Sequence, residues 1–144
     1  MTVRTWLIVV LRIAGGVTLA AFPAMLLPVE WMASTHAQLG LGEFPRAPVV
    51  DYLARSIAAL YGFHGVLVLI VSTDPIRYRP IVWFIAAMNI VFGLMLIAID
   101  LHAGLPAYWT ALEGPPIVAF GAVIALLNRR MPTASAEASR IGRG

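Results

Sequence analysis

Apolar residues form four long blocks along the chain, separated by shorter polar stretches. The blocks cover about residues 5–27, 51–72, 80–100 and 107–129. Because an α-helix rises 1.5 Å per residue, about 20 apolar residues suffice to cross the hydrocarbon core of a bilayer. The pattern therefore predicts an all-α membrane protein, with four antiparallel transmembrane helices packed in a bundle as one domain over residues 1–130.

The longest polar connection follows the first apolar block. Residues 29–38 mix apolar side chains such as Trp31 with polar ones, and a Gly- and Pro-rich stretch follows over 40–48. We expect a short interfacial helix over 29–38 and then a loop. Because the other connections are short and rich in turn residues, we expect successive spans to be antiparallel neighbours.

Two of the blocks contain interruptions. Arg12 splits the first block and no soluble domain follows it, which favours a retained span over a cleaved signal peptide. In the fourth block Pro115 and Pro116 lack N–H donors, which leaves the carbonyls of Ala111 and Leu112 without their helical partners beside Glu113. Either these carbonyls receive a cation or a lipid headgroup, or Arg55 and water satisfy them. This span is either kinked at the prolines, or begins near Pro115 and tilts its basic end into the headgroups.

Composition agrees with a bilayer environment, since 60% of the 144 residues are hydrophobic and only 12% are charged. Soluble domains are usually about 45–50% apolar and about 25% charged, so a water-soluble domain is excluded. The formal charge of +3 is small and comes from arginines near the helix ends. We therefore expect membrane lipid, and no nucleic acid, as a partner.

The arginines also predict an orientation. Most of them flank the same side of the four spans, whereas Arg46 and Arg55 lie toward the other side. Because positively charged loops stay in the cytoplasm, we expect both termini to be cytoplasmic, in the bacterial cytoplasmic (inner) membrane. The tail over 131–144 is rich in Ala, Ser and Arg, so we expect it to be polar, cytoplasmic and disordered.

Small residues recur every four positions on several spans, and they mark where helices approach each other closely in lipid. The three stripes are Gly16, Ala20 and Ala24; Ala54, Ala58 and Gly62; and Gly121 with Ala125.

Polar residues within the spans fall into two layers. Arg12, His64 and Asn89 lie about 12 to 14 Å from the cytoplasmic ends of three different spans, and Tyr61 lies one turn from His64. We expect these four residues to form an inner polar cluster. The cluster is either a site for a small molecule, an anion or a proton, or a hydrogen-bonded group that sets the helix register.

The second layer is an outer polar cluster of Arg55, Asp100, Glu113, Trp109 and Tyr108. The spacing allows an ion pair between Arg55 and either Glu113 or Asp100, which would neutralise charges that are costly in lipid. Trp109 and Glu113 share a helix face at i, i+4, and both aromatic residues suit the interfacial aromatic belt.

The sequence offers no catalytic or metal-binding signature. Its three histidines lack the spacing of metal ligands, there is no cysteine, and Ser56 is more than 10 Å along the helix axis from His64. We expect no enzymatic activity, no metal and no cofactor. The region around His36 is most simply a solvated interfacial helix.

Several segments together resemble small bacterial four-helix membrane proteins of the DUF4345 and DoxX-like families. The resemblance covers most of residues 3–130 and is carried by Leu53-Ala54-Arg55-Ser56, Leu60-Tyr61-Gly62, the connection from Asp74 to Pro80, Asp100, and Glu113-Gly114-Pro115. It implies a four-span integral membrane fold and points to Arg55, Tyr61, Gly62 and Glu113, but it implies no activity.

Three functions are compatible with these features. The first is an accessory or assembly subunit of a membrane complex, or a homo-oligomer, that uses its small-residue faces for contact. The second is a small transporter or a lipid- or quinone-binding protein that uses the intramembrane Arg, His and Glu residues. The third, a membrane enzyme with Glu113 or His64 as acid or base, has the least support.

Overall fold

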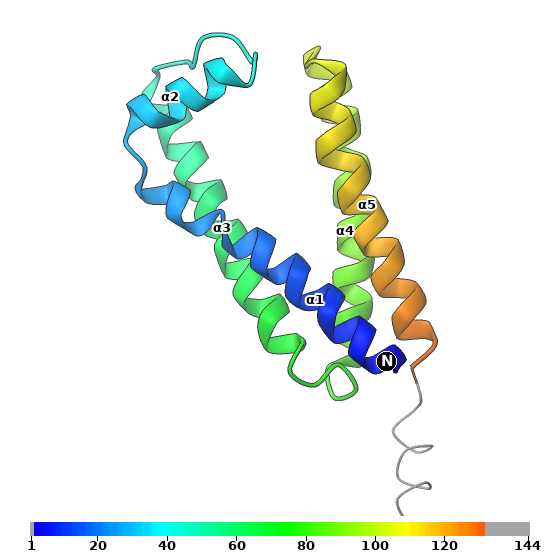
Figure 1. The fold of residues 1–144 in the computed structure, drawn as a ribbon. Coiled ribbons are helices and arrows are strands. Elements are labelled where there is room, and N and C mark those ends of the chain that lie inside the picture. The colour runs from blue at the N-terminus through cyan, green and yellow to red at the C-terminus, as the bar shows by residue number, and fades with distance from the viewer. Residues whose placement is uncertain (1, 132–144) are drawn as a thin grey trace, which may run out of the picture.

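The computed structural model describes residues 2–131, and its regular elements are all helical. They are α1 (Val3–Leu19), the 3₁₀-helix η1 (Phe22–Leu26), α2 (Val29–Gln38), α3 (Pro48–Val71), α4 (Arg79–Ala103) and α5 (Ala107–Arg129) (Figure 1). Four segments are long and apolar enough to cross a membrane: α1 with η1, α3, α4 and α5. The predicted four-span all-α fold is confirmed, and the short helix expected over 29–38 is α2.

The first span is bent. Its α-helix ends at Leu19 and the chain continues as η1, which contains Pro23. Proline has no N–H, and its ring clashes with the carbonyl four residues earlier, so it favours a kink or a break in an α-helix, and here the α-helix gives way to the 3₁₀-helix. The ring of Phe22 fills the space that a side chain at Gly62 of α3 would occupy, and it packs edge-on against Phe63 at 5.5 Å between centroids. The bend therefore seats η1 on α3.

The four spans form two helical hairpins that meet at one end. α1 and η1 pack along α3, α4 packs along α5, and α1 also contacts α5. At the end that carries the N-terminus the hairpins touch, whereas at the opposite end they diverge, with α2 and the loop after it on one side (Figure 1). We call these the closed end and the open end. Successive spans are neighbours within each hairpin, but α3 and α4 hardly touch, which differs from the expected packing.

Glycines allow the helices of each hairpin to approach closely. A Cβ atom at Gly65 of α3 would lie 2.7 Å from the carbonyl oxygen of Gly15 on α1. A Cβ atom at Gly93 of α4 would lie 2.8 Å from the carbonyl oxygen of Gly114 on α5. Both distances are shorter than van der Waals contact, so backbone packs on backbone at these crossings, as in other membrane helix pairs.

Only part of the predicted small-residue pattern serves this packing. Gly62 and Gly121 lie at helix contacts as expected, but a Cβ at Gly16 would meet no heavy atom of the described chain within 4 Å. Its neighbour Gly15 packs instead, because α1 turns the face of Leu7, Leu11 and Gly15 inward. Since successive residues differ by 100° around a helix, Gly16 then faces outward.

The hydrophobic core lies at the closed end, where both hairpins meet. Its buried members are Leu7, Leu11, Val68, Val71, Val82, Ile85, Ala86, Ile124 and Met131. The guanidinium of Arg79 donates a 3.1 Å hydrogen bond to the carbonyl oxygen of Asn128, which ties the start of α4 to the end of α5. Met131, which the sequence assigns to the polar tail, packs in this core; residues 132–144 lie outside the described residues.

The fourth span begins at Ala107 and continues through both prolines as one helix. The alternative in which it begins near Pro115 is therefore wrong. Pro115 and Pro116 are exposed on the outer face of α5, while Gly114 beside them is buried against α4. The prolines thus remove backbone donors on the side of the helix that faces away from α4, and close packing with α4 is retained.

Candidate functional site

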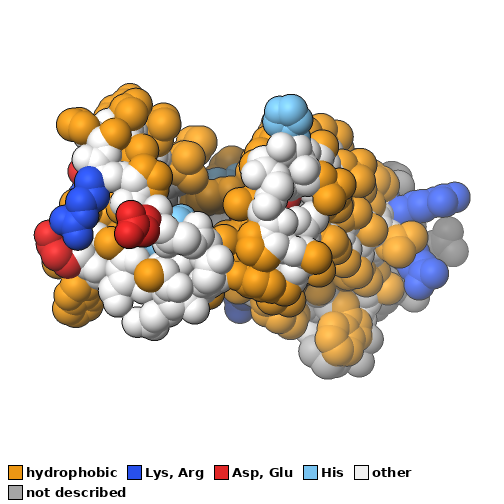
Figure 2. Space-filling model, turned by 90° about the horizontal axis from the view of Figure 1, so that it is seen from above, with side chains coloured by type: hydrophobic (Ala, Val, Ile, Leu, Met, Phe, Trp, Pro, Cys, Tyr) orange, Lys and Arg blue, Asp and Glu red, His pale blue; other side chains and the backbone are white. Residues whose placement is uncertain are grey.

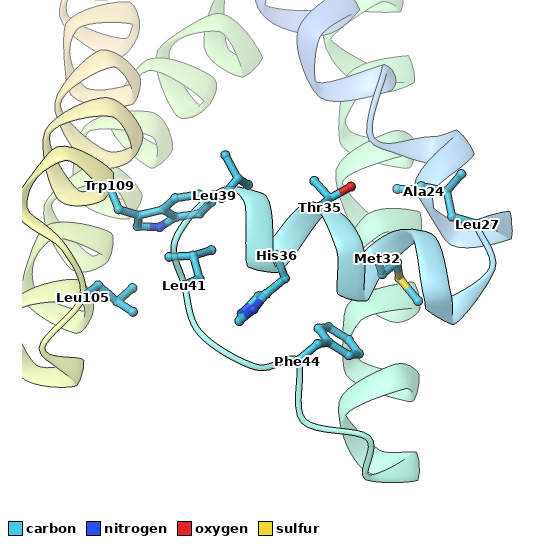
Figure 3. Close-up of a pocket in the computed structure, with 10 residues that line it drawn as sticks. All are labelled: Ala24, Leu27, Met32, Thr35, His36, Leu39, Leu41, Phe44, Leu105 and Trp109. Carbon is cyan, nitrogen blue, oxygen red and sulfur yellow. The ribbon is translucent and has the colours of Figure 1, made fainter.

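A pocket of about 500 Å³ lies at the open end, where α2 and the following loop face the start of α5. Seen from this end, the surface is hollowed between the two hairpins (Figure 2). Ten residues line the pocket: Ala24, Leu27, Met32, Thr35, His36, Leu39, Leu41, Phe44, Leu105 and Trp109 (Figure 3). Eight of them have mainly apolar side chains, so the pocket offers a mainly apolar surface, and its polar groups are Thr35 and His36 on α2 and the indole N–H of Trp109 on α5. We call it the open-end pocket.

One face of α2 supplies a large part of the lining. Met32, Thr35, His36 and Leu39 follow each other at i, i+3, i+4 and i+7, which places their side chains on one side of the helix. The sequence interpretation treated this segment as a solvated interfacial helix and missed the site. The spacing of these four residues is the signal that could have indicated it.

The loop after α2 folds back past this face. Gly40 and Gly42 have positive φ angles of 66° and 88°, which residues with a side chain rarely adopt. The reversal brings the carbonyl oxygen of Gly42 to 3.1 Å from Nδ1 of His36. It also packs the ring of Phe44 edge-on against the imidazole, at 5.6 Å between centroids. His36 is thereby held in one orientation in the wall of the pocket.

The opposite wall belongs to the start of α5. The indole Nε1 of Trp109 donates a 2.6 Å hydrogen bond to Oε2 of Glu113, on the shared face that the i, i+4 spacing predicts. The hydroxyl of the neighbouring residue, Tyr108, donates to the carbonyl oxygen of Leu39. This bond connects the loop after α2 to α5, so it joins the two hairpins at the end where they otherwise diverge.

Arg55 does not form the ion pair that the sequence suggested. Its Nε donates to both carboxylate oxygens of Asp51, at 2.9 and 3.0 Å. Its Nη1 donates to the carbonyl oxygen of Met25 at 2.5 Å. Within residues 2–131 no ion pair joins Arg55 to Asp100 or Glu113. The reason is the divergence of the hairpins, which separates this part of α3 from α4 and α5. Arg55 therefore stabilises the bend of the first span.

Asp100 lies in the α4–α5 hairpin instead. Its side chain, in the last turn of α4, is only 3% exposed, and within the described chain neither Oδ2 nor the buried hydroxyl of Thr110 has a hydrogen-bond partner. The residues of the predicted outer polar cluster thus occupy three places: Arg55 on the first hairpin, Asp100 within the second, and Tyr108, Trp109 and Glu113 beside the pocket.

The residues of the predicted inner polar cluster also make separate contacts. Arg12 is exposed on the outward side of α1, and His64 is half-buried on α3. The amide of Asn89 donates a 2.8 Å hydrogen bond to a carbonyl one turn earlier in its own helix, α4. Tyr61 packs its ring against Phe92 of α4, at 6.2 Å between centroids. No hydrogen bond between described residues joins Arg12, His64 and Asn89 to one another.

Residues 2–131 contain no group of three or more His, Asp or Glu side chains that could hold a metal ion. In comparisons with protein-family models, with curated proteins and with solved structures, the chain matches none of them. Any functional proposal for this membrane protein must therefore start from the geometry of its own residues.

Proposed function

We propose that this four-span membrane protein binds one amphipathic lipid molecule in the open-end pocket. The observation that carries the proposal is the pocket itself, which has about 500 Å³ of space and eight apolar residues among its ten lining residues. This volume lies within the roughly 300–1,000 Å³ that is typical of small-molecule sites. An apolar chain is the favoured occupant, because its contact with this lining removes apolar surface from water.

The position of the pocket also supports a lipid ligand. It lies at the open end of the membrane spans, and its wall combines the last part of the first span with the start of the fourth. The polar groups of Thr35 and His36 are confined to α2. A ligand with an apolar chain and a small polar end would satisfy both parts of this lining at once.

Native mass spectrometry of the protein, purified in mild detergent, tests this proposal. We expect a bound species of lipid mass on the native chain. Ala24→Phe, which fills the pocket, should remove it, whereas Ala87→Phe should not, because Ala87 is exposed on α4 and does not line the pocket. No bound lipid on the native chain, or equal binding by both variants, would refute the proposal.

A second function, as an accessory or assembly subunit or as a homo-oligomer, is favoured by the outward face of α1. Arg12 is exposed there without an ion-pair partner in the described chain, and Gly16 one turn further leaves space for another helix. An unpaired arginine in the middle of a span costs about 2.5–3.5 kcal/mol on insertion scales, so a neighbouring helix with a carboxylate would stabilise it.

Size-exclusion chromatography with mass detection distinguishes this second function. Gly16→Leu should release the chain from a larger complex without changing its own helix content, whereas Ala87→Leu on α4 should leave the complex intact. A native chain that is monomeric in mild detergent, with no co-purified subunit, would argue against it.

We propose further that the closed end faces the cytoplasm of a bacterial cell. The helix ends that meet at this end, the start of α1, the start of α4 and the end of α5 (Figure 1), carry or adjoin Arg4, Arg77, Arg79, Arg129 and Arg130, as expected from the positive-inside rule. A reporter fused after Arg130 should then be active only in the cytoplasm. A reporter inserted in the loop over 40–47 should be active only in the periplasm, and the opposite pattern would overturn this orientation.

A further inference from the structure

We infer that the open-end pocket recognises a single-chain lipid alcohol through a hydrogen bond from the ligand hydroxyl to Nε2 of His36. The inference rests on the proposed lipid-binding function and adds the chemical class of the ligand. It follows from the hydrogen bonds that already occupy the polar groups around the pocket.

The loop after α2 determines which imidazole nitrogen carries the proton. Nδ1 of His36 lies 3.1 Å from the carbonyl oxygen of Gly42. A carbonyl oxygen can only accept a hydrogen bond, so Nδ1 must be the donor. In a neutral imidazole the other nitrogen, Nε2, then carries a lone pair and acts as an acceptor. The fold thus makes Nε2, the ring nitrogen that Gly42 does not contact, a hydrogen-bond acceptor.

That acceptor is available to a ligand. His36 lines the pocket, and its ring extends from α2 into the space beside Leu41 and Phe44 (Figure 3). Within residues 2–131 Nε2 makes no hydrogen bond. An apolar ligand would leave this nitrogen without a partner, and an unpaired polar group shielded from water is costly. The pocket therefore favours a ligand that brings a hydrogen-bond donor to His36.

The other polar groups in the lining do not reverse this preference. The indole N–H of Trp109 is already donated to Glu113, and the hydroxyl of Tyr108, which is not itself a lining residue, is already donated to the carbonyl oxygen of Leu39. The hydroxyl of Thr35 can donate or accept, so it does not discriminate between ligands. His36 therefore decides the selectivity.

The acceptor at Nε2 determines which polar group of a lipid fits the pocket. Esters, ethers, quinones and ionised phosphates offer only acceptors, which would face the lone pair of Nε2. A hydroxyl group can donate to that lone pair. With room for one molecule of modest size and an otherwise apolar lining, a fatty or isoprenoid alcohol fits the pocket best.

Matched probes test this inference. We would titrate the detergent-purified full chain at pH 8 with 1-hexadecanol, farnesol and the methyl ether of each, and follow binding by native mass spectrometry. The methyl ethers keep the chain and the oxygen but lose the donor. Each alcohol should bind roughly tenfold more tightly than its ether, the effect of one well-placed hydrogen bond of about 1.4 kcal/mol.

Two variants test whether Nε2 of His36 causes the preference for alcohols over ethers. His36→Phe keeps a ring in the wall but removes the acceptor, so it should bind alcohol and ether equally well. His102→Phe is the matched control, because His102 does not line the pocket, and it should keep the preference. Retained ether binding by His36→Phe would also show that this variant still folds.

The outcomes separate this inference from the proposed function. A preference for alcohol with either chain, lost in His36→Phe, supports the inference. Equal binding of alcohols and ethers to the native chain would overturn the role of His36 and leave lipid binding intact. Absence of binding by all four probes, together with no co-purified lipid, would overturn the proposed function as well.

Discussion

Alanine at Gly65 should destabilise the protein, although alanine is the better helix former. Gly65 lies on α3 where α1 crosses it, and a Cβ atom there would stand 2.5 Å from the backbone nitrogen of Leu19 and 2.7 Å from the carbonyl oxygen of Gly15. Both neighbours are backbone atoms, so no side-chain rotation can relieve the contact. The two helices would have to separate.

The expected size follows from two opposing terms. Reaching an ordinary contact of at least 3.4 Å requires a local displacement of about 1 Å. Crowding of this kind in a packed interior costs about 1–3 kcal/mol. Replacing glycine by alanine within a helix stabilises the folded state by about 0.5–1 kcal/mol. The difference spans about 0–2.5 kcal/mol, and we expect Gly65→Ala to lower the free energy of unfolding by an amount near the middle of this range, about 1 kcal/mol.

Gly16 provides a control on the partner helix. A Cβ there would meet no atom of the described chain within 4 Å, so Gly16→Ala gains helix propensity without crowding. It should raise the free energy of unfolding by up to about 1 kcal/mol. The measurement is reversible unfolding of each variant in mixed micelles at increasing mole fraction of sodium dodecyl sulfate. Equal stability of the two variants would refute the close approach of α1 and α3.

Four further substitutions test individual contacts. Tyr108→Phe removes the hydroxyl that donates to Leu39, so the distance distribution between spin labels on α2 and α5 should broaden; an unchanged distribution would contradict a linking role. Asp51→Ala should lower stability by less than about 1 kcal/mol, because the pair with Arg55 is about one-third exposed. Arg55→Ala should lower it more, since it also leaves a carbonyl of η1 unpaired; equal losses would argue against that bond. Asp100→Asn should raise the free energy of unfolding by about 1 kcal/mol, because it removes the charge of a carboxylate that is 3% exposed and has an oxygen without a described partner, and a decrease would indicate a missing contact.

The four spans and α2 were predictable because they depend on local properties of the chain. A run of about 20 apolar residues must form a helix in lipid, since every backbone polar group needs an internal partner there. Residues 29–38 form a helix with the predicted bounds, and Trp109 bonds to Glu113 because four residues make one helical turn.

Hydropathy and spacing could not show which faces meet. They indicate the depth of a residue along its helix, but its lateral position depends on how the helices cross. Arg55 and Glu113 were expected to pair because they lie at similar depths in the membrane. The hairpins diverge at this depth, so Arg55 instead pairs with Asp51, one turn earlier on its own helix. Similarly, Gly15 rather than Gly16 packs on α3, because the rotation of α1 about its own axis turns Gly15 toward α3.

The open-end pocket is the clearest product of tertiary structure. Its walls come from η1, α2, the loop after it and the start of α5, and the lining residues Ala24 and Trp109 are 85 positions apart in the chain. A solitary histidine in a short polar helix carries no distinctive sequence signal. His36 becomes a candidate ligand-binding residue only because Gly40 and Gly42 reverse the loop onto it and α5 closes the other side.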